Sequence, residues 1–279
     1  MMLPPLNLNS EPSLPGWARL PINHANLPAV ILGSLMFHDH PTELMLDSVR
    51  ELHPRLYLGL DSLTEHAERA EFFRDYVTTH FMLHKPDCVG LTDSTSVRRQ
   101  RLDYLRVLRG WMFDSDSVEA AVLKGWVESR FGLLPRYHQG PLQDFSGDTY
   151  QRYLADRSRG LYNTNSLEGQ LDLLYSYCQY EWQRQQRPAK LELFRGVNEI
   201  CHHDVLERPN PSSYIMLLNN INSFTSNAET ADAFGDYLLQ TQMPAAKLLY
   251  FPGLLPGTLK GEQEYLAIGG VYRLQLYRL

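Results

Sequence analysis

The 279-residue chain has no apolar run long enough to cross a membrane. Its longest hydrophobic stretch extends only from Leu27 to Phe37 and contains Pro28 and Gly33, whereas a spanning helix needs about 20 apolar residues. No basic residue precedes Arg19, so the N-terminus lacks the positively charged start of a secretory signal. These absences lead us to expect a cytoplasmic protein without a membrane span.

Cysteine is also scarce, and basic residues are fewer than acidic ones. Cys88, Cys178 and Cys201 are the only cysteines and none belongs to a C-x-x-C pair, which favours reduced thiols over a disulfide framework. The net charge of −6 and the pI near 5.9 argue against nucleic acid as a partner. The sequence contains neither G-x-G-x-x-G nor G-x-x-x-x-G-K-[ST], so neither a Rossmann fold nor a P-loop is supported.

Hydrophobic spacing divides the chain into a helical first two-thirds and a β-rich last third. We predict an α+β fold with an irregular lead-in (1–28), a mainly helical part (29–187) and a β-rich part (188–279) that form one compact unit. Helices are expected at 42–53, 62–84, 97–113, 117–131, 150–157, 166–186 and 228–239. Strands are expected at 190–197, 214–225, 245–251, 264–269 and 271–279.

The strongest chemical signal is a pair of carboxylates near the C-terminus. Glu262 and Glu264 follow a loop rich in proline and glycine and enter a predicted strand. Residues two apart on a strand point to the same face, so the carboxylates would lie about 6–7 Å apart on one side. Such a pair suits chemistry through an oxocarbenium ion: one carboxylate stabilises the positive charge and the other orients or deprotonates the nucleophile. A solvent-facing edge strand would carry the same pair without any function.

Two further segments of the β-rich part combine a strand with residues suited to binding a ligand. Arg195 ends an apolar strand and is followed by Gly196, so a guanidinium that can bind phosphate lies beside backbone that a ligand can approach closely. The stretch 221–226, Ile-Asn-Ser-Phe-Thr-Ser, ends in hydroxyls before the short predicted helix. Taken alone, the arginine is typical of a protein surface and the hydroxyls are typical of a helix cap.

In their order along the chain, strand–Arg–Gly, Phe–x–Ser and Glu–x–Glu resemble the Arg–Ser–Glu signature of the mono-ADP-ribosyltransferases. The resemblance covers about residues 191–270, and the Glu–x–Glu form is similar to members that modify arginine side chains. It implies a two-sheet core packed with the helices, NAD as co-substrate in the cleft between the sheets, and no metal in the chemistry. Where the wider superfamily commonly has the last hydroxyl of Ser–Thr–Ser, this chain has Ala228.

The resemblance implies a role for each residue of the signature. Arg195 would bind an NAD phosphate, and the backbone of Gly196 would hold the nicotinamide amide. Glu264 would bond the 2′-hydroxyl of the nicotinamide ribose and stabilise the oxocarbenium ion as nicotinamide leaves. Glu262 would orient the acceptor guanidinium and take its proton as the new bond forms, because the pKa of arginine lies above about 12.

Two residues, Ser226 and Ser223, could be the serine of the signature. The Phe–x–Ser alignment makes Ser226 the residue that positions Glu264 by hydrogen bonding, but Ser223 could serve instead. Ser223, Phe224 and Thr225 are expected to line the NAD site on the same strand.

The front of the chain carries a second, narrower resemblance. Residues 20–28, Leu-Pro-Ile-Asn-His-Ala-Asn-Leu-Pro, and the stretch that runs on to His40 and Pro41 look like the dinitrogenase reductase ADP-ribosyltransferase family, which the chain length also fits. That resemblance implies transfer of ADP-ribose to an arginine of the nitrogenase iron protein, which inactivates it reversibly and regulates nitrogen fixation. It also implies a PII-type nitrogen signal protein as a regulatory partner, and the helical part would recognise the target.

Three other interpretations use some of the same residues. An NAD glycohydrolase would use the same site with water as the acceptor, but it would give no role to Glu262. A glycoside hydrolase also needs two carboxylates, but it gives no role to Arg195 and Gly196. A non-catalytic module that senses NAD or binds a partner would fit a site made degenerate by Ala228.

The histidines do not indicate a metal site. His80 and His84 have the i, i+4 spacing of a zinc pair on a helix, but no H-E-x-x-H glutamate accompanies them. The other histidine pairs lack a convincing third ligand, so we expect no bound metal.

Overall fold

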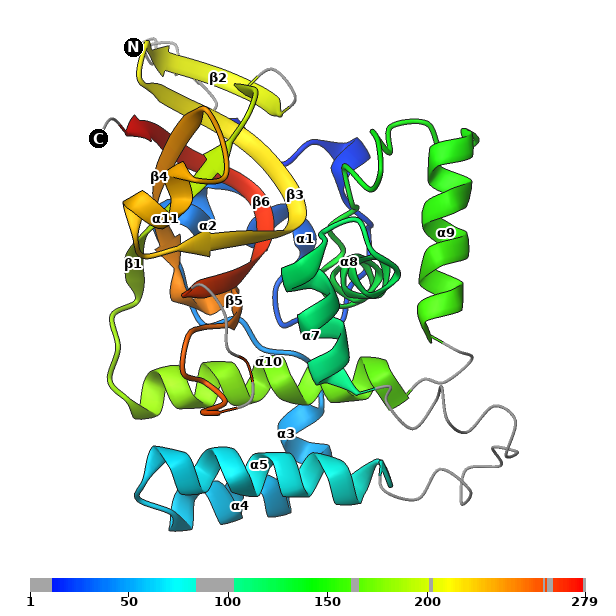
Figure 1. The fold of residues 1–279 in the computed structure, drawn as a ribbon, viewed down its shortest axis with the longest axis vertical. Coiled ribbons are helices and arrows are strands. Elements are labelled where there is room, and N and C mark those ends of the chain that lie inside the picture. The colour runs from blue at the N-terminus through cyan, green and yellow to red at the C-terminus, as the bar shows by residue number, and fades with distance from the viewer. Residues whose placement is uncertain are drawn as a thin grey trace, which may run out of the picture.

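The computed structural model describes residues 12–83, 103–161, 166–200, 203–257, 259 and 263–277. Helices form the first part of the chain and antiparallel strands the last (Figure 1), so the predicted α+β class is confirmed. The helical elements are η1 (Gly16–Ala18), α1 (Ala29–Leu32), α2 (Leu35–Asp39), α3 (Val49–Leu52), α4 (Pro54–Ser62), α5 (His66–His80), α7 (Tyr104–Phe113), α8 (Val118–Phe131), α9 (Asp148–Leu161), α10 (Ser166–Arg184), α11 (Ala228–Asp232) and η4 (Ala245–Lys247). The strands are β1 (Lys190–Val197), β2 (Asp204–Asn210), β3 (Ser213–Thr225), β4 (Tyr237–Pro244), β5 (Leu248–Tyr250) and β6 (Glu264–Tyr277).

Capping residues mark the ends of the helices nearest the sheet. Helix α8 begins after Ser117, whose hydroxyl accepts a hydrogen bond from the Ala120 amide at 3.1 Å, and it ends at Gly132, whose φ is 69°. Both predicted ends of this helix are confirmed. Helix α7 begins after Asp103, whose carboxylate accepts from the Arg106 amide at 2.8 Å.

The helix predicted over 42–53 is wrong for most of its length. The Asn26 side chain donates to the Glu43 carbonyl at 3.1 Å and accepts from the Met45 amide at 2.9 Å. Because these backbone groups bond a distant side chain, the segment 41–45 has no regular secondary structure and only the last turn, α3, is helical.

Two other helices differ from their predicted ranges. The helix predicted at 62–84 is α5, which begins only at His66: Ser62 is the last residue of α4, and the extended backbone at Leu63 separates the two helices. The helix predicted at 228–239 ends as α11 at Asp232, and its last residues belong to β4. The predicted helical residues 84 and 97–102 lie outside the described residues.

The six strands form one antiparallel sheet in the order β2-β3-β1-β4-β6-β5, and β3 also pairs with β6. Strand β1 pairs with β4 along its whole length but meets β3 only at Phe194 and Thr225, whereas β3 and β6 pair over most of their length. Two strand pairs, β1–β4 and β3–β6, therefore join at their ends, and the long strands curve around each other (Figure 1). This closure brings the end of β1 beside the end of β3 and the start of β6.

Two details of the sheet were not predicted. Strand β2 was not among the predicted strands; it contains Pro209 and lies at the edge of the sheet, where a missing amide is tolerated. The strands predicted at 264–269 and 271–279 are one strand, β6, whose described part ends at Tyr277. Opposite it, β3 has a register shift between Leu218 and Ile221.

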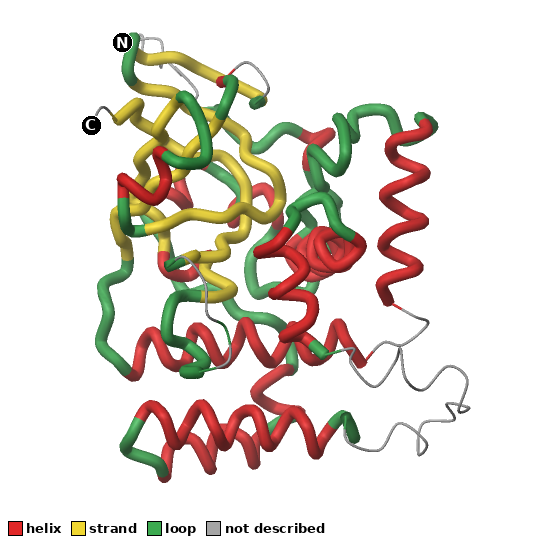
Figure 2. The backbone as a smooth tube through the Cα atoms, viewed as in Figure 1, coloured by secondary structure: helices red, strands yellow, loops and turns green. Residues whose placement is uncertain are grey.

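One main hydrophobic core extends through the helical and the β-rich parts. Helix α10 runs between the strands and the α4–α5 pair (Figure 2). It packs against β5 on one side and against α3, α5 and α7 elsewhere. Five residues at helical spacing on α10 are buried: Leu167, Leu171, Leu174, Cys178 and Trp182.

No helix in the described part of the chain combines the length and apolar character that crossing a membrane requires.

Candidate active site

Arg195 lies where β1 and β3 join. Its Nη1 donates a hydrogen bond to the carbonyl oxygen of Ser223 at 2.8 Å. Its Nε is buried and has no hydrogen-bond partner, and no carboxylate of the described residues lies within ion-pair distance of the guanidinium. Burial lowers the pKa of this guanidinium, and the nearby Glu264 carboxylate opposes the shift. A desolvated cation with an unused donor suits an anionic ligand such as a phosphate.

Glu264 begins β6, and Ser223 of the neighbouring strand bonds its carboxylate. The Ser223 hydroxyl donates to Oε1 of Glu264 at 2.5 Å. The strand register explains this contact: Thr225 lies opposite Glu264, and Ser223 lies two residues away on the same face of β3. Three residues of the signature therefore meet at Ser223, whose carbonyl accepts from Arg195 and whose hydroxyl donates to Glu264.

The structure gives Ser223 the hydrogen bond that was expected of Ser226. Ser226 follows the end of β3 and its side chain is exposed. The position of Ser223 is decided by the pairing of β3 with β6, which the Phe–x–Ser alignment does not take into account. The hydrogen bond to Glu264 is therefore made by Ser223, and the choice between Ser223 and Ser226 as the serine of the signature stays a prediction.

Phe224 and Thr225 have structural partners beside the site. Phe224 is buried, and the centre of its ring lies 6.0 Å from the guanidinium carbon of Arg195. The Thr225 hydroxyl accepts a hydrogen bond from the Asn227 amide at 3.2 Å, which holds the turn into α11. Their contact with NAD stays a prediction.

Gly196 is required by the packing of α11. A Cβ atom at this position would lie 2.1 Å from the carbonyl oxygen of Ala231. A larger residue would therefore push α11 away from β1. The contact of the Gly196 backbone with nicotinamide stays a prediction.

Glu262 lies outside the described residues, so its place beside Glu264 stays a prediction. The loop that leads toward it is anchored by the helical part. The two ring nitrogens of His66 lie 2.7 Å from the Gly253 carbonyl oxygen and 2.9 Å from a carboxylate oxygen of Glu181. Both neighbours accept hydrogen bonds, so the doubly protonated imidazolium satisfies them together.

The ion pair below this loop is deeply buried. Arg69 donates to both carboxylate oxygens of Glu181, with distances of 2.5 and 3.0 Å. Burial acts to raise the pKa of Glu181, but hydrogen bonds from His66, Arg69 and Gln185 outweigh it and lower the pKa to about 2. The hydrogen bond to Glu181 in turn raises the pKa of His66.

Trp111 contacts the site, and the sequence indicated for it only a place on the apolar stripe of a helix. It lies near the end of α7 and is 4% exposed. Its indole Nε1 donates to the Ser223 hydroxyl at 2.8 Å. Sequence spacing carries no signal for this contact, because the two residues lie in different parts of the chain.

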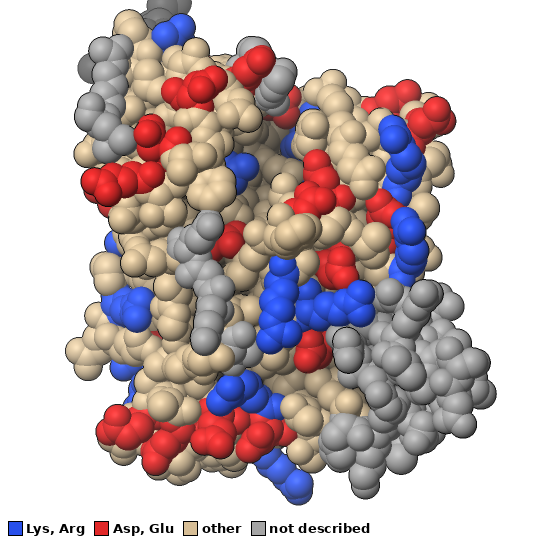
Figure 3. Space-filling view, viewed as in Figure 1, with Lys and Arg blue, Asp and Glu red and all other residues tan. Residues whose placement is uncertain are grey.

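The surface is hollowed between the strands and helices α7 and α8, and basic side chains gather over α7 beside the hollow (Figure 3). A separate cavity of about 410 Å³ lies between residues 41–51 and α10. Its lining includes Arg50, Tyr175 and Gln179 but none of the signature residues, so it is not the predicted NAD site.

Within the described residues, no group of three or more His, Cys, Asp or Glu side chains could hold a metal ion. His80 stacks on Tyr76 with 5.6 Å between the ring centres. The other member of the predicted zinc spacing, His84, lies outside the described residues, as do Cys88 and Cys201.

A family model described as dinitrogenase reductase ADP-ribosyltransferase (DRAT) matches residues 22–276. The chain belongs to the dinitrogenase reductase ADP-ribosyltransferase family. A relative from Rhodospirillum rubrum, named NAD(+)–dinitrogen-reductase ADP-D-ribosyltransferase, is 38% identical over 259 residues, which cover 90% of this chain and 92% of that protein. No solved structure matches the chain significantly. The family resemblance is confirmed, and the match spans the helical and the β-rich parts alike.

Proposed function

We propose that this protein transfers the ADP-ribosyl group of NAD to dinitrogenase reductase, the nitrogenase iron protein, and that the acceptor is an arginine side chain. Membership of the family and the activity in the name of the Rhodospirillum rubrum relative support the reaction and its substrate. The observation that carries the site is the meeting of Arg195 and Glu264 at Ser223. The two joined strand pairs are consistent with the two-sheet NAD-binding core of the wider superfamily.

Arg195 holds NAD in this proposal. Its buried Nε has no partner in the described part of the chain, and a phosphate oxygen would supply the missing acceptor. The hydrogen bond from Nη1 to the Ser223 carbonyl fixes the guanidinium plane, so its remaining donors point in a defined direction. The Gly196 backbone would bond the nicotinamide amide.

Glu264 acts at the reacting carbon. Its carboxylate bonds the ribose 2′-hydroxyl and stabilises the positive charge that develops as nicotinamide departs with the electron pair of the C1′–N bond. Ser223 restrains this carboxylate through a hydrogen bond to one of its oxygens. Loss of such a preorganised charge costs about 3–4 kcal/mol, or a factor of about 10²–10³ in rate.

Glu262 directs the second half of the reaction. Two residues before Glu264, its carboxylate would align the acceptor guanidinium and take its proton as the nitrogen attacks C1′. Water would replace the guanidinium in an NAD glycohydrolase, which is the alternative activity of the same site. Regulation by a PII-type signal protein stays a prediction from the resemblance, and a location in the cytoplasm stays a prediction from the sequence.

The test is incubation of the purified protein with labelled NAD and nitrogenase iron protein, followed by mass spectrometry of the iron protein. We expect one ADP-ribosyl group on an arginine, and we expect the Glu264→Gln variant to lose both transfer and nicotinamide release by about 10²–10³-fold while it still binds NAD. Release of nicotinamide without modification of the iron protein would favour the glycohydrolase. A Glu264→Gln variant that keeps more than about a tenth of the activity would remove Glu264 from its role.

A further inference from the structure

Trp111 belongs to the helical part, yet it is hydrogen-bonded to the proposed catalytic site. Its indole nitrogen lies 2.8 Å from the Ser223 hydroxyl oxygen, which in turn lies 2.5 Å from Oε1 of Glu264. This three-residue chain joins α7, β3 and β6. Trp111 is 4% exposed, so water does not compete freely for its N–H.

The chemistry of the three groups fixes the direction of both hydrogen bonds, from Trp111 to Ser223 and from Ser223 to Glu264. An indole N–H can only donate, so the Ser223 oxygen must accept from Trp111. The serine has a single proton, and an ionised carboxylate can only accept. With one lone pair of its oxygen occupied by the indole, the hydroxyl is turned to donate to Glu264.

We propose that Trp111 is a positioning residue for the reaction: its indole N–H orients the Ser223 hydroxyl, which holds the Glu264 carboxylate in place. This inference rests on the proposed role of Glu264. It makes the helical part a component of the catalytic geometry, beyond the recognition of a target that the sequence implied.

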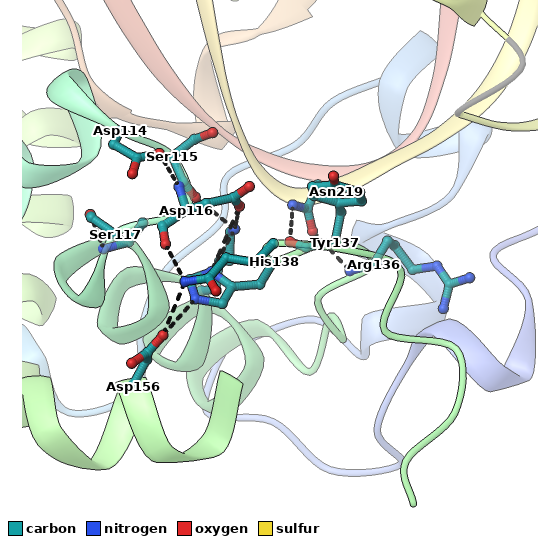
Figure 4. Close-up of polar contacts among 12 residues, drawn as sticks. Asp114, Ser115, Asp116, Ser117, Arg136, Tyr137, His138, Asp156 and Asn219 are labelled. Carbon is teal, nitrogen blue, oxygen red and sulfur yellow. Dashed lines mark hydrogen bonds and ion pairs between the residues drawn. The ribbon is translucent and has the colours of Figure 1, made fainter. Parts of the chain in front are cut away.

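A polar cluster behind Trp111 keeps the indole in position. The buried ammonium of Lys124 lies 5.8 Å from the centre of the indole ring. It donates to the Ser115 carbonyl at 2.7 Å and to the Asp116 carboxylate at 3.1 Å. Figure 4 shows Asp116 and His138 facing one another beside the turn between α7 and α8, and His138 also lies 3.1 Å from Lys124. Lys124 therefore contacts both the Trp111 indole and the turn between α7 and α8.

The helical part also holds β3 at a second place. The Asn219 side chain accepts from the Arg136 amide at 2.8 Å and donates to the Tyr137 carbonyl at 3.0 Å (Figure 4). The next residue, Asn220, donates to the Lys124 carbonyl in α8 at 2.7 Å. These bonds lie at the register shift of β3, three and four residues before Ser223. The helical part thus holds strand β3 both at the shift and at Ser223, which defines where Ser223 meets Glu264.

The experiment compares Trp111→Phe with Trp126→Phe. Trp126 is a matched control, because it is also buried, lies in the adjacent helix α8, and donates its indole N–H to a side chain, Asp172, at 2.8 Å. Both substitutions remove one buried indole hydrogen bond and similar ring volume. Only Trp111 bonds the serine beside Glu264.

We expect Trp111→Phe to lower kcat for nicotinamide release by about five- to tenfold, which is the value of one hydrogen bond between neutral groups. The KM for NAD should stay within about twofold, and the acid limb of the kcat–pH profile should move to higher pH because the serine no longer favours the ionised carboxylate. Trp126→Phe should change none of these, although both variants unfold at lower denaturant concentration. The Trp111→Phe substitution should also have no further effect in a Ser223→Ala background, since Trp111 acts through Ser223.

Equal kinetics and equal pH profiles of the two tryptophan variants would overturn the inference. If Trp111→Phe does not fold, Trp111→His carries the same comparison, because a ring N–H is restored and activity above that of the Ser223→Ala variant is expected. Glu264→Gln is assayed beside them. If it is inactive while Trp111→Phe behaves like the control, only the role of Trp111 fails; if it stays active, the proposed site itself fails.

Discussion

The replacement of Ser223 by alanine tests the assembled site most directly, and Ser226→Ala is its matched control. Both changes remove one hydroxyl from the same six-residue segment. The Ser223 hydroxyl bonds Trp111 and Glu264, whereas the Ser226 side chain is exposed beyond the end of the strand. The backbone carbonyl of Ser223, which accepts from Arg195, is unchanged in the alanine variant.

The expected magnitude follows from the two lost bonds. A hydrogen bond to a charged group contributes about 1.5–3 kcal/mol, and each 1.36 kcal/mol corresponds to a factor of about ten. If Glu264 uses this bond mainly in the transition state, kcat should fall by about 10–100-fold. The indole N–H of Trp111 would also be left buried without its acceptor, which lowers the free energy of unfolding by about 1–3 kcal/mol.

The assay is nicotinamide release at saturating NAD, together with urea unfolding of each variant. Ser223→Ala should lose kcat with a KM for NAD close to that of the wild type, and its unfolding midpoint should be lower. Ser226→Ala should keep kcat within about twofold and the free energy of unfolding within about 0.5 kcal/mol. Greater loss of kcat in Ser226→Ala than in Ser223→Ala would refute the register argument and restore the Phe–x–Ser alignment.

Three further predictions concern binding, transfer and pH. Arg195→Ala should raise the KM for NAD by about tenfold or more, and Arg195→Lys should recover it only in part because an ammonium lacks the fork of donors; an unchanged KM would contradict the phosphate role. Glu262→Gln should abolish transfer to the iron protein while slow NAD hydrolysis survives, and equal loss of both would assign Glu262 to bond cleavage. The raised pKa of His66 means that its bond to Glu181 stabilises the fold fully below pH 6.5 and is lost as the pH rises through the raised value. The difference in unfolding free energy between wild type and His66→Gln should therefore shrink as the pH rises above about 6.5, and a constant difference would show that the imidazolium is not the bonded form.

A residue of the helical part hydrogen-bonds the loop that precedes Glu262. His66 and Glu181 belong to α5 and α10, and His66 bonds the Gly253 carbonyl. Trp111 of α7 reaches the opposite side of the site through Ser223. The helical part therefore contacts both the serine and the loop of the predicted signature, so changes in helix packing are expected to alter catalysis.

Local chemistry was enough to determine several elements from the sequence alone. Strand β1 lies at its predicted residues, and α8 has both of its predicted ends, because alternation, an N-cap serine and a C-terminal glycine act within a few residues of one another. The order of Arg195, the hydroxyl-rich stretch 221–226 and Glu264 indicated the mono-ADP-ribosyltransferases, and residues 20–41 indicated the family, before any contact was known. Strand alternation and helix capping depend on residues close together in the sequence.

Only the tertiary structure decided which residues meet. Ser223 rather than Ser226 faces Glu264 because the register between β3 and β6 is set by pairing between strands, and a shift of one residue reverses the face. The segment 41–45 is non-helical because the distant Asn26 side chain bonds its backbone. Trp111 has the spacing of an ordinary core residue, and its role depends on one hydrogen bond across more than a hundred residues of chain. Periodicity and capping record local preferences, whereas strand register and long-range hydrogen bonds form only when the whole chain has packed.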